Sequence, residues 1–367
     1  MPKEIIFALL VIITLIFIFV AGFRIYWHIK SATDLRNHLD DNLKKTRGKK
    51  ETILFIENSD STKRHIVTNE MDENQPIMLA SVTKLYTHSV IYSMVKEGLI
   101  ELQKPISFYL EKSQWQGINT ISDIDYSDKI TVRMLLDQNS GIADYETDFK
   151  KDESIIDKVK REDFSLSESQ AIELTKKLEG RFKPGENKAY YSNLNAILLG
   201  LIAEKVSGKS LVDLYEKYIF QPLKLSNTMV ISKENSVIPY LQDRKTSRTL
   251  YASSAVASGG LVSNVRELMI FLKAFHQGIL FKKSYLSNSD FNSIQFFPLK
   301  YGAGMMSVEM PFVLSPLLDA PQILGHSGLS GSFAFYCPSK DLYLVGSLNE
   351  YEANPYSWIF KYINAMK

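Results

Sequence analysis

The sequence predicts an α/β (α+β) protein: an antiparallel sheet flanked by helices, with an inserted all-helical lobe and one N-terminal transmembrane helix. Short apolar or alternating segments, typical of strands, lie at both ends of the chain, at 52–68 and 305–348. The stretch between them, about 105–250, is dominated by helical patterns. The simplest packing joins the two ends into one sheet and inserts the helical stretch as a second lobe. A cleft between the lobes is then the natural place for a site.

The composition excludes several classes of function. The 367 residues include 43 basic and 41 acidic side chains, giving a net charge of +2, and 45% of the residues are hydrophobic. This is typical of a globular protein with a sizeable core. No basic run is interleaved with stacking aromatic residues, so nothing indicates nucleic-acid binding. The single cysteine, Cys337, excludes an internal disulfide framework and a zinc site built from cysteines. The histidines show no metal-ligand spacing, and we expect no metal or organic cofactor.

Residues 1–4 are expected to be a short tail and residues 5–23 a transmembrane anchor. The stretch 5–22 carries no charge and is about long enough to cross a bilayer as a helix. Tyr26 and Trp27 follow it, where an interfacial aromatic belt would lie. A cleaved signal peptide is the alternative, but its apolar region should be shorter and should precede a better small-x-small cleavage site.

Residues 24–50 are predicted to form a solvated juxtamembrane stalk, because they are polar and charged and end in a basic run at 44–50. A patch for lipid headgroups is the alternative for that run. One basic residue precedes the apolar segment and three follow it closely, so a positive-inside count leaves the bulk of the chain in the cytoplasm. The family resemblance given later in this subsection implies the opposite orientation. Against the charge count, we therefore predict a single-pass protein of the cell membrane whose larger part is extracellular.

Residues 51–367 are predicted to form one globular domain, whose helical lobe covers about 105–250. Strands are expected on either side of a polar turn near the start and again in the C-terminal part, at 52–56, 65–68, 305–313, 322–324, 331–336 and 342–348. Helices are expected at 81–98, 130–136, 167–180, 194–206, 211–220, 265–275 and 355–366.

A short motif at the start of the first of these helices, Ser81 with Lys84 three residues later, suggests nucleophilic catalysis. On a helix the two side chains share a face. A serine hydroxyl is a poor nucleophile until a neighbour removes its proton, and a lysine can do so when burial and nearby charge lower its pKa. The start of the helix adds unpaired N–H groups that suit an oxyanion. A second Ser-x-x-Lys copy, Ser93 with Lys96, lies well inside the same helix and is interpreted as two ordinary helix residues.

Two further motifs could converge on the same cleft. In Tyr191-Ser192-Asn193, the phenol can take and return a proton if lysines lower its pKa, and the asparagine amide can hold a substrate carbonyl and the lysine amine. A helix start capped by serine or asparagine is the alternative interpretation. Gly325-His326-Ser327-Gly328 lies where one strand would end and the next begin. His326 could donate to a carboxylate or carbonyl and changes charge near neutral pH; a structural histidine is the alternative.

Taken together, Ser-x-x-Lys, Tyr-Ser-Asn and His-Ser-Gly, in this order and with these separations, resemble the motifs of serine hydrolases related to class C β-lactamases and D-Ala-D-Ala carboxypeptidases. The resemblance runs from about residue 52 to the C-terminus. It includes segments that flank the motifs, at 80–85, 130–136, 140–141, 184–185, 200–208 and 257–261. It implies a β-lactamase/transpeptidase-like fold, with a sheet flanked by helices and an all-helical lobe.

The resemblance also implies roles for the residues that match the motifs. Ser81 matches the acylated serine, Lys84 the lysine that assists proton transfer, and Tyr191 the general base for acylation. The backbone N–H groups of Ser81 and Leu329 would form the oxyanion hole by position.

Substrate binding would fall to Asn193, His326, Ser327 and Gly328. His326 departs from the pattern, because class C β-lactamases usually carry a lysine there, whereas peptidase and esterase relatives often carry histidine. The departure removes a permanent charge that would help to bind a carboxylate. We therefore expect a peptidase or esterase, and a carboxylated substrate should lose kcat/KM as pH rises through about 6 to 7 if the charge of His326 binds it.

The motifs and the resemblance together predict a membrane-anchored serine hydrolase that acts through an acyl-enzyme on an amide or ester. The resemblance alone implies a D-alanyl-type peptidase or esterase of the bacterial cell envelope. The substrate would be a small molecule or a cell-wall component. One alternative is a class C-type β-lactamase. Another is a non-catalytic penicillin-recognising sensor or scaffold, against which the complete set of Ser, Lys, Tyr and Asn argues. No protein partner is indicated.

Overall fold

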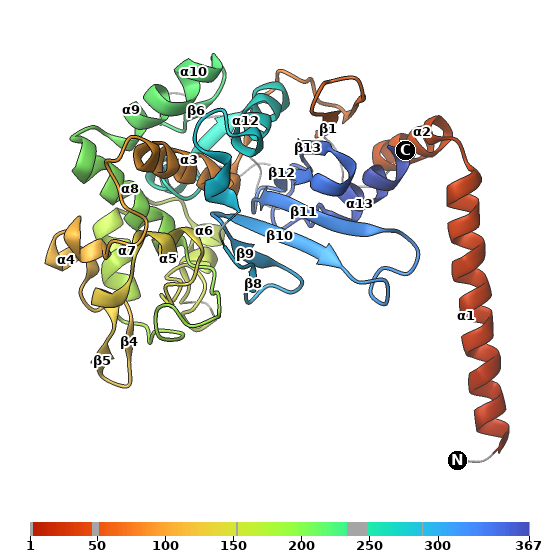
Figure 1. Cartoon of the computed structure of the whole chain (residues 1–367), viewed down its shortest axis with the longest axis horizontal. Helices are drawn as coiled ribbons and strands as arrows, with labels where there is room; N and C mark the ends of the chain where they lie inside the picture. The colour runs from red at the N-terminus through yellow and green to blue at the C-terminus, as the bar shows by residue number, and fades with distance from the viewer. Residues whose placement is uncertain (1–2, 46–50, 152, 233–247, 288, 367) are drawn as a thin grey trace.

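The computed structural model describes residues 3–45, 51–151, 153–232, 248–287 and 289–366. Figure 1 shows a sheet lobe beside a helical lobe, with one long helix, α1, projecting from the sheet side. Within the described residues the main sheet has eight strands in the order β2-β1-β13-β12-β11-β10-β9-β8. All neighbouring pairs are antiparallel. The predicted fold class is confirmed.

The two ends of the chain meet in this sheet, as expected. β1 pairs with β13, from Ile53 opposite Ser347 to Asn58 opposite Leu342. The strands of the main sheet are β1 Thr52–Asn58, β2 Arg64–Asn69, β8 Asn292–Ser293, β9 Lys300–Gly302, β10 Met305–Met310, β11 Ala320–Ser327, β12 Ser332–Cys337 and β13 Leu342–Ser347. Two small sheets contain β3 Ile77–Met78, β6 Met229–Val230 and β7 Leu261–Ser263, and β4 Thr120–Ile121 and β5 Ile124–Asp125.

Helices cover both faces of the sheet and form the second lobe. Their bounds are α1 Lys3–Ile29, α2 Ala32–Lys45, α3 Thr83–Lys96, α4 Lys112–Trp115, α5 Val132–Leu136, α6 Ile155–Arg161, α7 Glu168–Thr175, α8 Asn193–Ser207, α9 Leu211–Tyr215, α10 Gln221–Leu223, α11 Thr249–Ser254, α12 Val265–Gln277 and α13 Tyr356–Ala365. α12 packs on β12, β13 and β1, whereas α13 packs on α2, which also contacts β2.

Strand β1 shows how the sheet serves two cores. Successive side chains of a strand point to opposite faces. Ile53 and Phe55 belong to the core that α12 and the helical lobe share, and Leu54 and Ile56 belong to the core with α2 and α13. A fully apolar strand, rather than an alternating one, is what a sheet covered on both faces requires.

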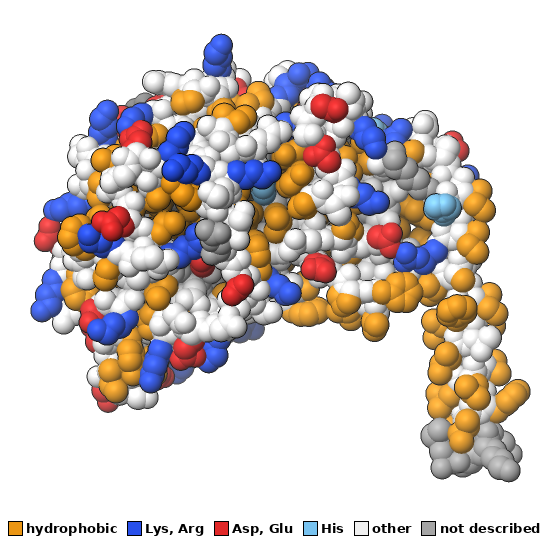
Figure 2. Space-filling view, viewed as in Figure 1, with side chains coloured by type: hydrophobic (Ala, Val, Ile, Leu, Met, Phe, Trp, Pro, Cys, Tyr) orange, Lys and Arg blue, Asp and Glu red, His pale blue; other side chains and the backbone are white. Residues whose placement is uncertain are grey.

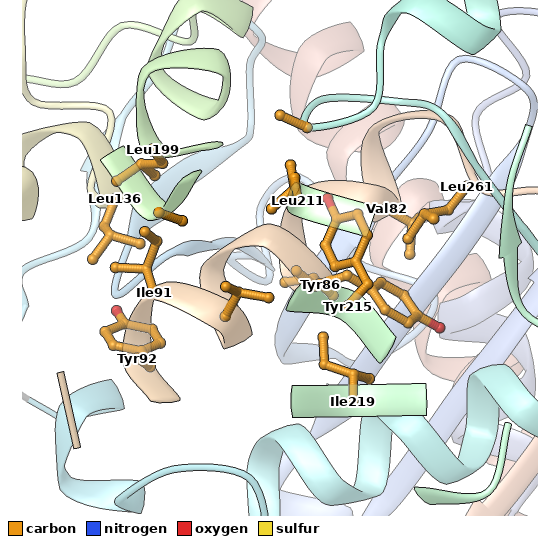
Figure 3. Packing of buried hydrophobic residues seen from close by; sticks show 14 of the residues in the cluster. Val82, Tyr86, Ile91, Tyr92, Leu136, Leu199, Leu211, Tyr215, Ile219 and Leu261 are labelled. Atoms are coloured by element: carbon orange, nitrogen blue, oxygen red, sulfur yellow. The ribbon is translucent and has the colours of Figure 1, made fainter. Parts of the chain in front are cut away.

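The helical lobe is organised around α3. Its residues are buried from Thr83 to Met94, as expected of a helix enclosed by protein on all sides. Tyr86 stacks on Phe271 of α12 with ring centroids 3.5 Å apart. Figure 3 shows Tyr86 beside Tyr215 and near Leu211, both of α9, whereas Leu199 of α8 lies near Ile91 of α3. Tight packing of this kind fixes the position of the residues at the start of α3.

Helix α2 differs from the expected solvated stalk. Its leucines Leu35, Leu39 and Leu43 are buried, and the helix packs on α13 and β2. The expectation of a solvated segment was therefore wrong for Ala32–Lys45. Leucines spaced four residues apart form an apolar stripe, which the many charged residues around them obscured. The rest of the predicted basic run, 46–50, lies outside the described residues.

This packing of α2 predicts a measurable stability effect. Leu39→Ala should lower the free energy of unfolding by about 2–4 kcal/mol, the usual cost of emptying a buried leucine site. Asn37, on the exposed side of the same helix, is the control, and Asn37→Ala should change stability by less than about 0.5 kcal/mol. Denaturant titration of the full chain in detergent measures both. Equal effects of the two substitutions would contradict the packing of α2 on the body.

Helix α1 leaves its apolar side chains uncovered, as Figure 2 shows along the projecting helix. Its part Ile5–Ile29 is long and apolar enough to cross a membrane, by length and composition. A signal sequence near an N-terminus meets the same criteria. The structure thus contains one N-terminal helix with the properties of a membrane span or of a signal sequence.

Candidate active site

Ser81 lies in a strained turn that leads into α3. The 3₁₀ turn Ala80–Val82 precedes the helix, and the N–H of Val82 donates to the carbonyl of Leu79 at 3.0 Å. The N–H of Ser81 comes before that bond and is among the groups that a helix start leaves without an intrahelical partner. Ala80 has φ 42°, a left-handed conformation that costs a residue with a side chain about 1–3 kcal/mol. The surrounding contacts hold this conformation in place.

The turn after β11 supplies some of those contacts. The Ser330 hydroxyl donates to the carbonyl of Met78 at 2.8 Å, and the Ser332 hydroxyl donates to the carbonyl of Leu79 at 2.7 Å. The end of the main sheet is therefore bonded to the segment that carries Ser81.

Gly328 allows the sheet to approach so closely. A Cβ atom at this position would lie 2.5 Å from the carbonyl oxygen of Leu79, which no side chain could tolerate. The close neighbour of this glycine is therefore a backbone segment of the chain itself. Leu329, the residue after Gly328, lines the same pocket as Ser81.

Lys84 is fully buried one turn after Ser81. Its Nζ donates to Ser81 Oγ at 3.1 Å. It also donates to Asn193 Oδ1 at 2.7 Å and to the carbonyl of Ser258 at 2.8 Å. Three acceptors match the three protons of an ammonium group. The lysine is thus held in one position, with one donor directed at the serine hydroxyl.

Two buried acids that the sequence analysis did not single out lie near this lysine. Asp144 accepts from the N–H of Asn193 at 2.9 Å, and Glu146 accepts from the Tyr251 hydroxyl at 2.6 Å. Burial raises the pKa of both carboxyl groups. Burial lowers the pKa of Lys84 to about 8, while the two acids act in the opposite direction. At pH 7 about a tenth of the lysine is then uncharged, compared with less than a thousandth for an ordinary lysine. The uncharged amine is the form that can accept a proton.

Tyr191 lies over the same lysine, with Lys84 Nζ 5.1 Å from the centre of its ring. Its backbone is fixed by Gln295, which accepts from its N–H and donates to its carbonyl, both at 2.8 Å. The phenol oxygen is buried and has no hydrogen-bond partner among the described residues. Burial raises the pKa of Tyr191 well above its usual value, although the nearby Ser81 hydroxyl lowers it. The expected lowering by lysine is not found, so the free protein holds a neutral phenol.

His326 is buried in β11 behind Tyr191. Its ring lies 5.9 Å from that of Tyr191 and 5.7 Å from that of Tyr301. Its Nδ1 is 2.7 Å from the carbonyl of Ser327, and its Nε2 has no partner among the described residues. Burial, helped by the charge of Lys84, holds the pKa of His326 well below its usual value. Burial and the lowered pKa argue against a charged histidine in the free chain, and binding of a substrate carboxylate by His326 stays a prediction that the pH experiment below tests.

Ser327 also points away from the pocket. Its hydroxyl lies 2.8 Å from the Tyr356 hydroxyl of α13, on the opposite side of the strand from His326, as the alternation of a strand requires. Of the three residues expected to bind substrate in this motif, none lines the pocket beside Ser81.

The neutral state of His326 makes a prediction about pH. The ratio of kcat/KM for a carboxylated ester to that for its neutral counterpart should show no step between pH 5.5 and 7.5, because a histidine that stays uncharged contributes no change in charge. Parallel pH profiles of the two esters measure it. A fall of that ratio of threefold or more across this range, lost in His326→Gln, would show that the ring is protonated and touches the substrate.

One pocket brings the remaining predicted residues together. Ser81, Asn193 and Leu329 line it, whereas Lys84 and Tyr191 lie behind the serine. The other lining residues are mostly apolar or small, with one acid and one base: Met78, Ala80, Glu146, Ile156, Val159, Ile231, Arg248, Thr249, Tyr251, Ala252, Ala255, Ser258, Gly259, Ser330 and Tyr351. Within the described part of the chain, no cluster of three or more His, Cys, Asp or Glu residues is placed to hold a metal ion.

A serine at a helix start, a buried lysine bonded to it, and a pocket between an antiparallel sheet and a helical lobe define a class of protein: serine hydrolases related to the penicillin-recognising enzymes. The family model described as "Beta-lactamase" matches residues 60–357. The chain therefore belongs to the β-lactamase family and is a serine hydrolase.

Known proteins of this kind agree with the assignment. Penicillin-binding protein 4* of Bacillus subtilis (strain 168) is 25% identical over 327 residues, which are 80% of this chain and 66% of that protein. The D-stereospecific amidohydrolase from Streptomyces sp. has a TM-score of 0.70 and 25% identity, covering 86% of this chain and 94% of that one. The D-amino acid amidase from Ochrobactrum anthropi SV3, complexed with D-phenylalanine, shares the fold with a TM-score of 0.71 at 19% identity, covering 90% and 98%.

The match to curated relatives is partial along their length. The chain spans 66% of penicillin-binding protein 4* and 28% and 32% of two further curated relatives.

Proposed function

We propose that the chain is a membrane-anchored hydrolase that forms an acyl-enzyme on Ser81 and cleaves D-alanyl-type amides or esters of the bacterial cell envelope. The observation that carries the proposal is the bond from Lys84 Nζ to Ser81 Oγ, 3.1 Å long, made by a buried lysine whose pKa is about 8. A lysine in this state can accept the proton of the serine as the hydroxyl attacks.

In the proposed reaction each of these groups has one role. Ser81 Oγ attacks the carbonyl carbon, and its proton passes to uncharged Lys84. The N–H groups of Ser81 and Leu329 stabilise the negative oxygen of the tetrahedral intermediate. Tyr191, neutral and close to Lys84, relays that proton to the leaving amine or alcohol as the carbon–heteroatom bond breaks. Water then attacks the acyl-enzyme, the acid leaves, and Ser81 recovers its proton.

The proposed substrate class rests on two supports. The printed names of the amidohydrolase and the amidase refer to D-stereospecific and D-amino acid substrates. In this chain Asn193 has its Oδ1 bonded to Lys84 and its Nδ2 3.3 Å from Asp144, so the amide is oriented beside the serine. An oriented amide can align a substrate carbonyl for attack. The expected D-configuration is open to direct measurement.

The proposed membrane anchor is α1, and the proposed location of the catalytic body is the outer face of the cell membrane. The length and exposed apolar surface of α1 support the anchor, because a helix needs about 20 apolar residues to cross a bilayer. An envelope substrate would require the body to be outside.

Mass spectrometry of the intact full chain tests the acyl-enzyme. A fluorophosphonate should add once to the wild-type chain and not to Ser81→Ala, and D-alanyl p-nitroanilide should be cleaved at least tenfold faster than its L-enantiomer. A stable penicillin adduct would assign it to the slowly deacylating peptidases, and fast penicillin turnover to the β-lactamases. An adduct that persists in Ser81→Ala, or faster cleavage of the L-enantiomer, would contradict the proposal.

A further inference from the structure

The loop between β10 and β11 exposes three consecutive large apolar side chains. Phe312, Val313 and Leu314 are 60%, 83% and 53% exposed. Single exposed apolar residues are ordinary, but an adjacent group of this kind marks a surface that another phase or molecule covers. These residues lie far from Ser81 in the sheet lobe, at the opposite end of β11 from His326, so the proposed reaction does not account for them.

The loop has a defined shape. The N–H groups of Leu314 and Ser315 both donate to the carbonyl of Pro311, at 2.9 and 3.1 Å. The Ser315 hydroxyl donates to the carbonyl of Leu318 at 2.6 Å. Internal bonds of this kind lower the cost of moving backbone out of water, since each polar group left unpaired there costs several kcal/mol.

The loop contacts α1 through Arg24, which lies just after the charge-free apolar stretch of that helix. Arg24 forms an ion pair with Asp319, with 2.5 Å between Nη2 and Oδ1. Its Nη1 donates to the carbonyl of Pro316 at 3.2 Å, and its guanidinium lies 5.4 Å from the centre of the Phe312 ring. Arg24 is the first charged residue after Glu4, so these contacts hold the loop at the level where the apolar stretch of α1 ends.

Figure 1 shows this loop as the part of the sheet lobe that reaches toward α1, and Figure 2 shows hydrophobic side chains gathered along the edge of the body that faces α1. If α1 crosses a bilayer, Arg24 lies at the headgroup level, where arginines at helix ends are commonly found. The apolar tip is then adjacent to the same boundary. Because the loop lies next to the end of the membrane-crossing part of α1, a lipid surface is the partner that best explains its exposed apolar side chains.

We propose that the loop of residues 311–319 inserts its apolar tip, Phe312 to Leu314, into the headgroup region of the same bilayer that α1 crosses. The loop is a second membrane contact, and it fixes the orientation of the catalytic body relative to the membrane. The charged residues nearest the tip in the sequence are acidic, Glu309 and Asp319, and Arg24 of α1 is the cation held beside it. The contact therefore depends on burial of the large apolar side chains in the interface and not on attraction to anionic lipid. This inference rests on the proposed anchoring by α1 and goes beyond it.

Lipid quenching of single labelled sites in the full chain tests the proposal. Val313→Cys, labelled with an environment-sensitive fluorophore and reconstituted in vesicles of phosphatidylglycerol and phosphatidylethanolamine, should be quenched at least threefold more by lipids with a shallow nitroxide than the control Ile279→Cys. Ile279 is 59% exposed and follows α12, away from α1. The native Cys337 is buried and should not react. Equal quenching at the two sites would overturn the proposal.

A third labelled site separates the two levels of inference. Phe17→Cys, in the exposed apolar part of α1, should be quenched most strongly by a deep nitroxide. If Phe17 is not quenched, the anchor itself fails, and the loop proposal fails with it. If Phe17 is quenched and Val313 is not, only the loop proposal fails. A blue shift at Val313 without lipid quenching would indicate that a protein covers the loop and would also overturn it. Val313→Asp should leave hydrolysis of a soluble ester unchanged, because the loop is outside the site.

Discussion

Ser81→Ala should reduce kcat/KM for the best ester or amide substrate by at least about 10⁴-fold, because no other group can form the acyl-enzyme. The hydroxyl accepts one bond from Lys84, and its loss creates almost no cavity. Thermal unfolding should therefore shift by only a few degrees, corresponding to about 1 kcal/mol. Steady-state kinetics of the purified full chain and a melting curve measure the two effects. Retention of more than a tenth of the activity would exclude Ser81 as the nucleophile.

The chain provides a matched control in its second Ser-x-x-Lys copy. Ser93 is buried in α3, where its hydroxyl donates to the carbonyl of Leu280 at 3.4 Å, and Lys96 is exposed at the end of the same helix. Ser93→Ala should leave kcat/KM within twofold of the wild-type value. Comparable losses in the two serine variants would mean that a general disturbance of α3, and not a lost nucleophile, explains the effect.

The two copies show how far the sequence could separate function from chance. The same spacing occurs twice in one helix, and position within the helix distinguished them: one serine lies at the start, where N–H groups are free, and the other lies inside. The joining of the chain ends into one sheet was also predictable, because the strand patterns at both ends were apolar enough to require a partner. Burial of α3 on all sides was not apparent, since its polar residues made it look less enclosed than it is.

The electrostatic environment of the site could not be predicted from the sequence. Asp144 and Glu146 alternate with apolar residues just after Ser140-Gly141, a pattern that resembles an ordinary surface turn. Their burial beside Lys84 depends on residues far away in the sequence, such as Asn193 and Tyr251. His326 illustrates the same limit: its motif was found, but its neutral state depends on enclosure by Tyr191 and other side chains that lie far apart in the sequence.

The pH dependence of catalysis should report Lys84 directly. With a free-enzyme pKa of about 8, kcat/KM for an uncharged ester should rise about tenfold per pH unit below pH 7.5 and level off above pH 8.5, because the uncharged amine is the active form. Lys84→Met should lose about 10²–10⁴-fold in kcat/KM, the usual contribution of a proton-transfer group, and the rise near pH 8 should disappear. A wild-type profile that is flat from pH 6 to 9 would show that another group accepts the proton.

The same lysine should link catalysis to stability. Burial places its folded-state pKa near 8, below the ordinary value of 10.5, and the difference corresponds to about 3 kcal/mol that disfavours the folded state. That cost is fully present below pH 8 and disappears as pH rises toward 10.5, since only the charged amine resists burial.

Between pH 7 and pH 10 the wild-type chain should therefore gain about 2–3 kcal/mol of unfolding free energy relative to Lys84→Met. Denaturant titrations of both chains at the two pH values measure this difference. Because both chains carry the same other titrating groups, the contributions of those groups cancel when the two chains are compared. A constant difference between the chains would show that the amine titrates normally, and a normally charged Lys84 could not serve as the base. Reduced stability at neutral pH is thus the expected cost of holding a lysine ready to accept the proton of Ser81.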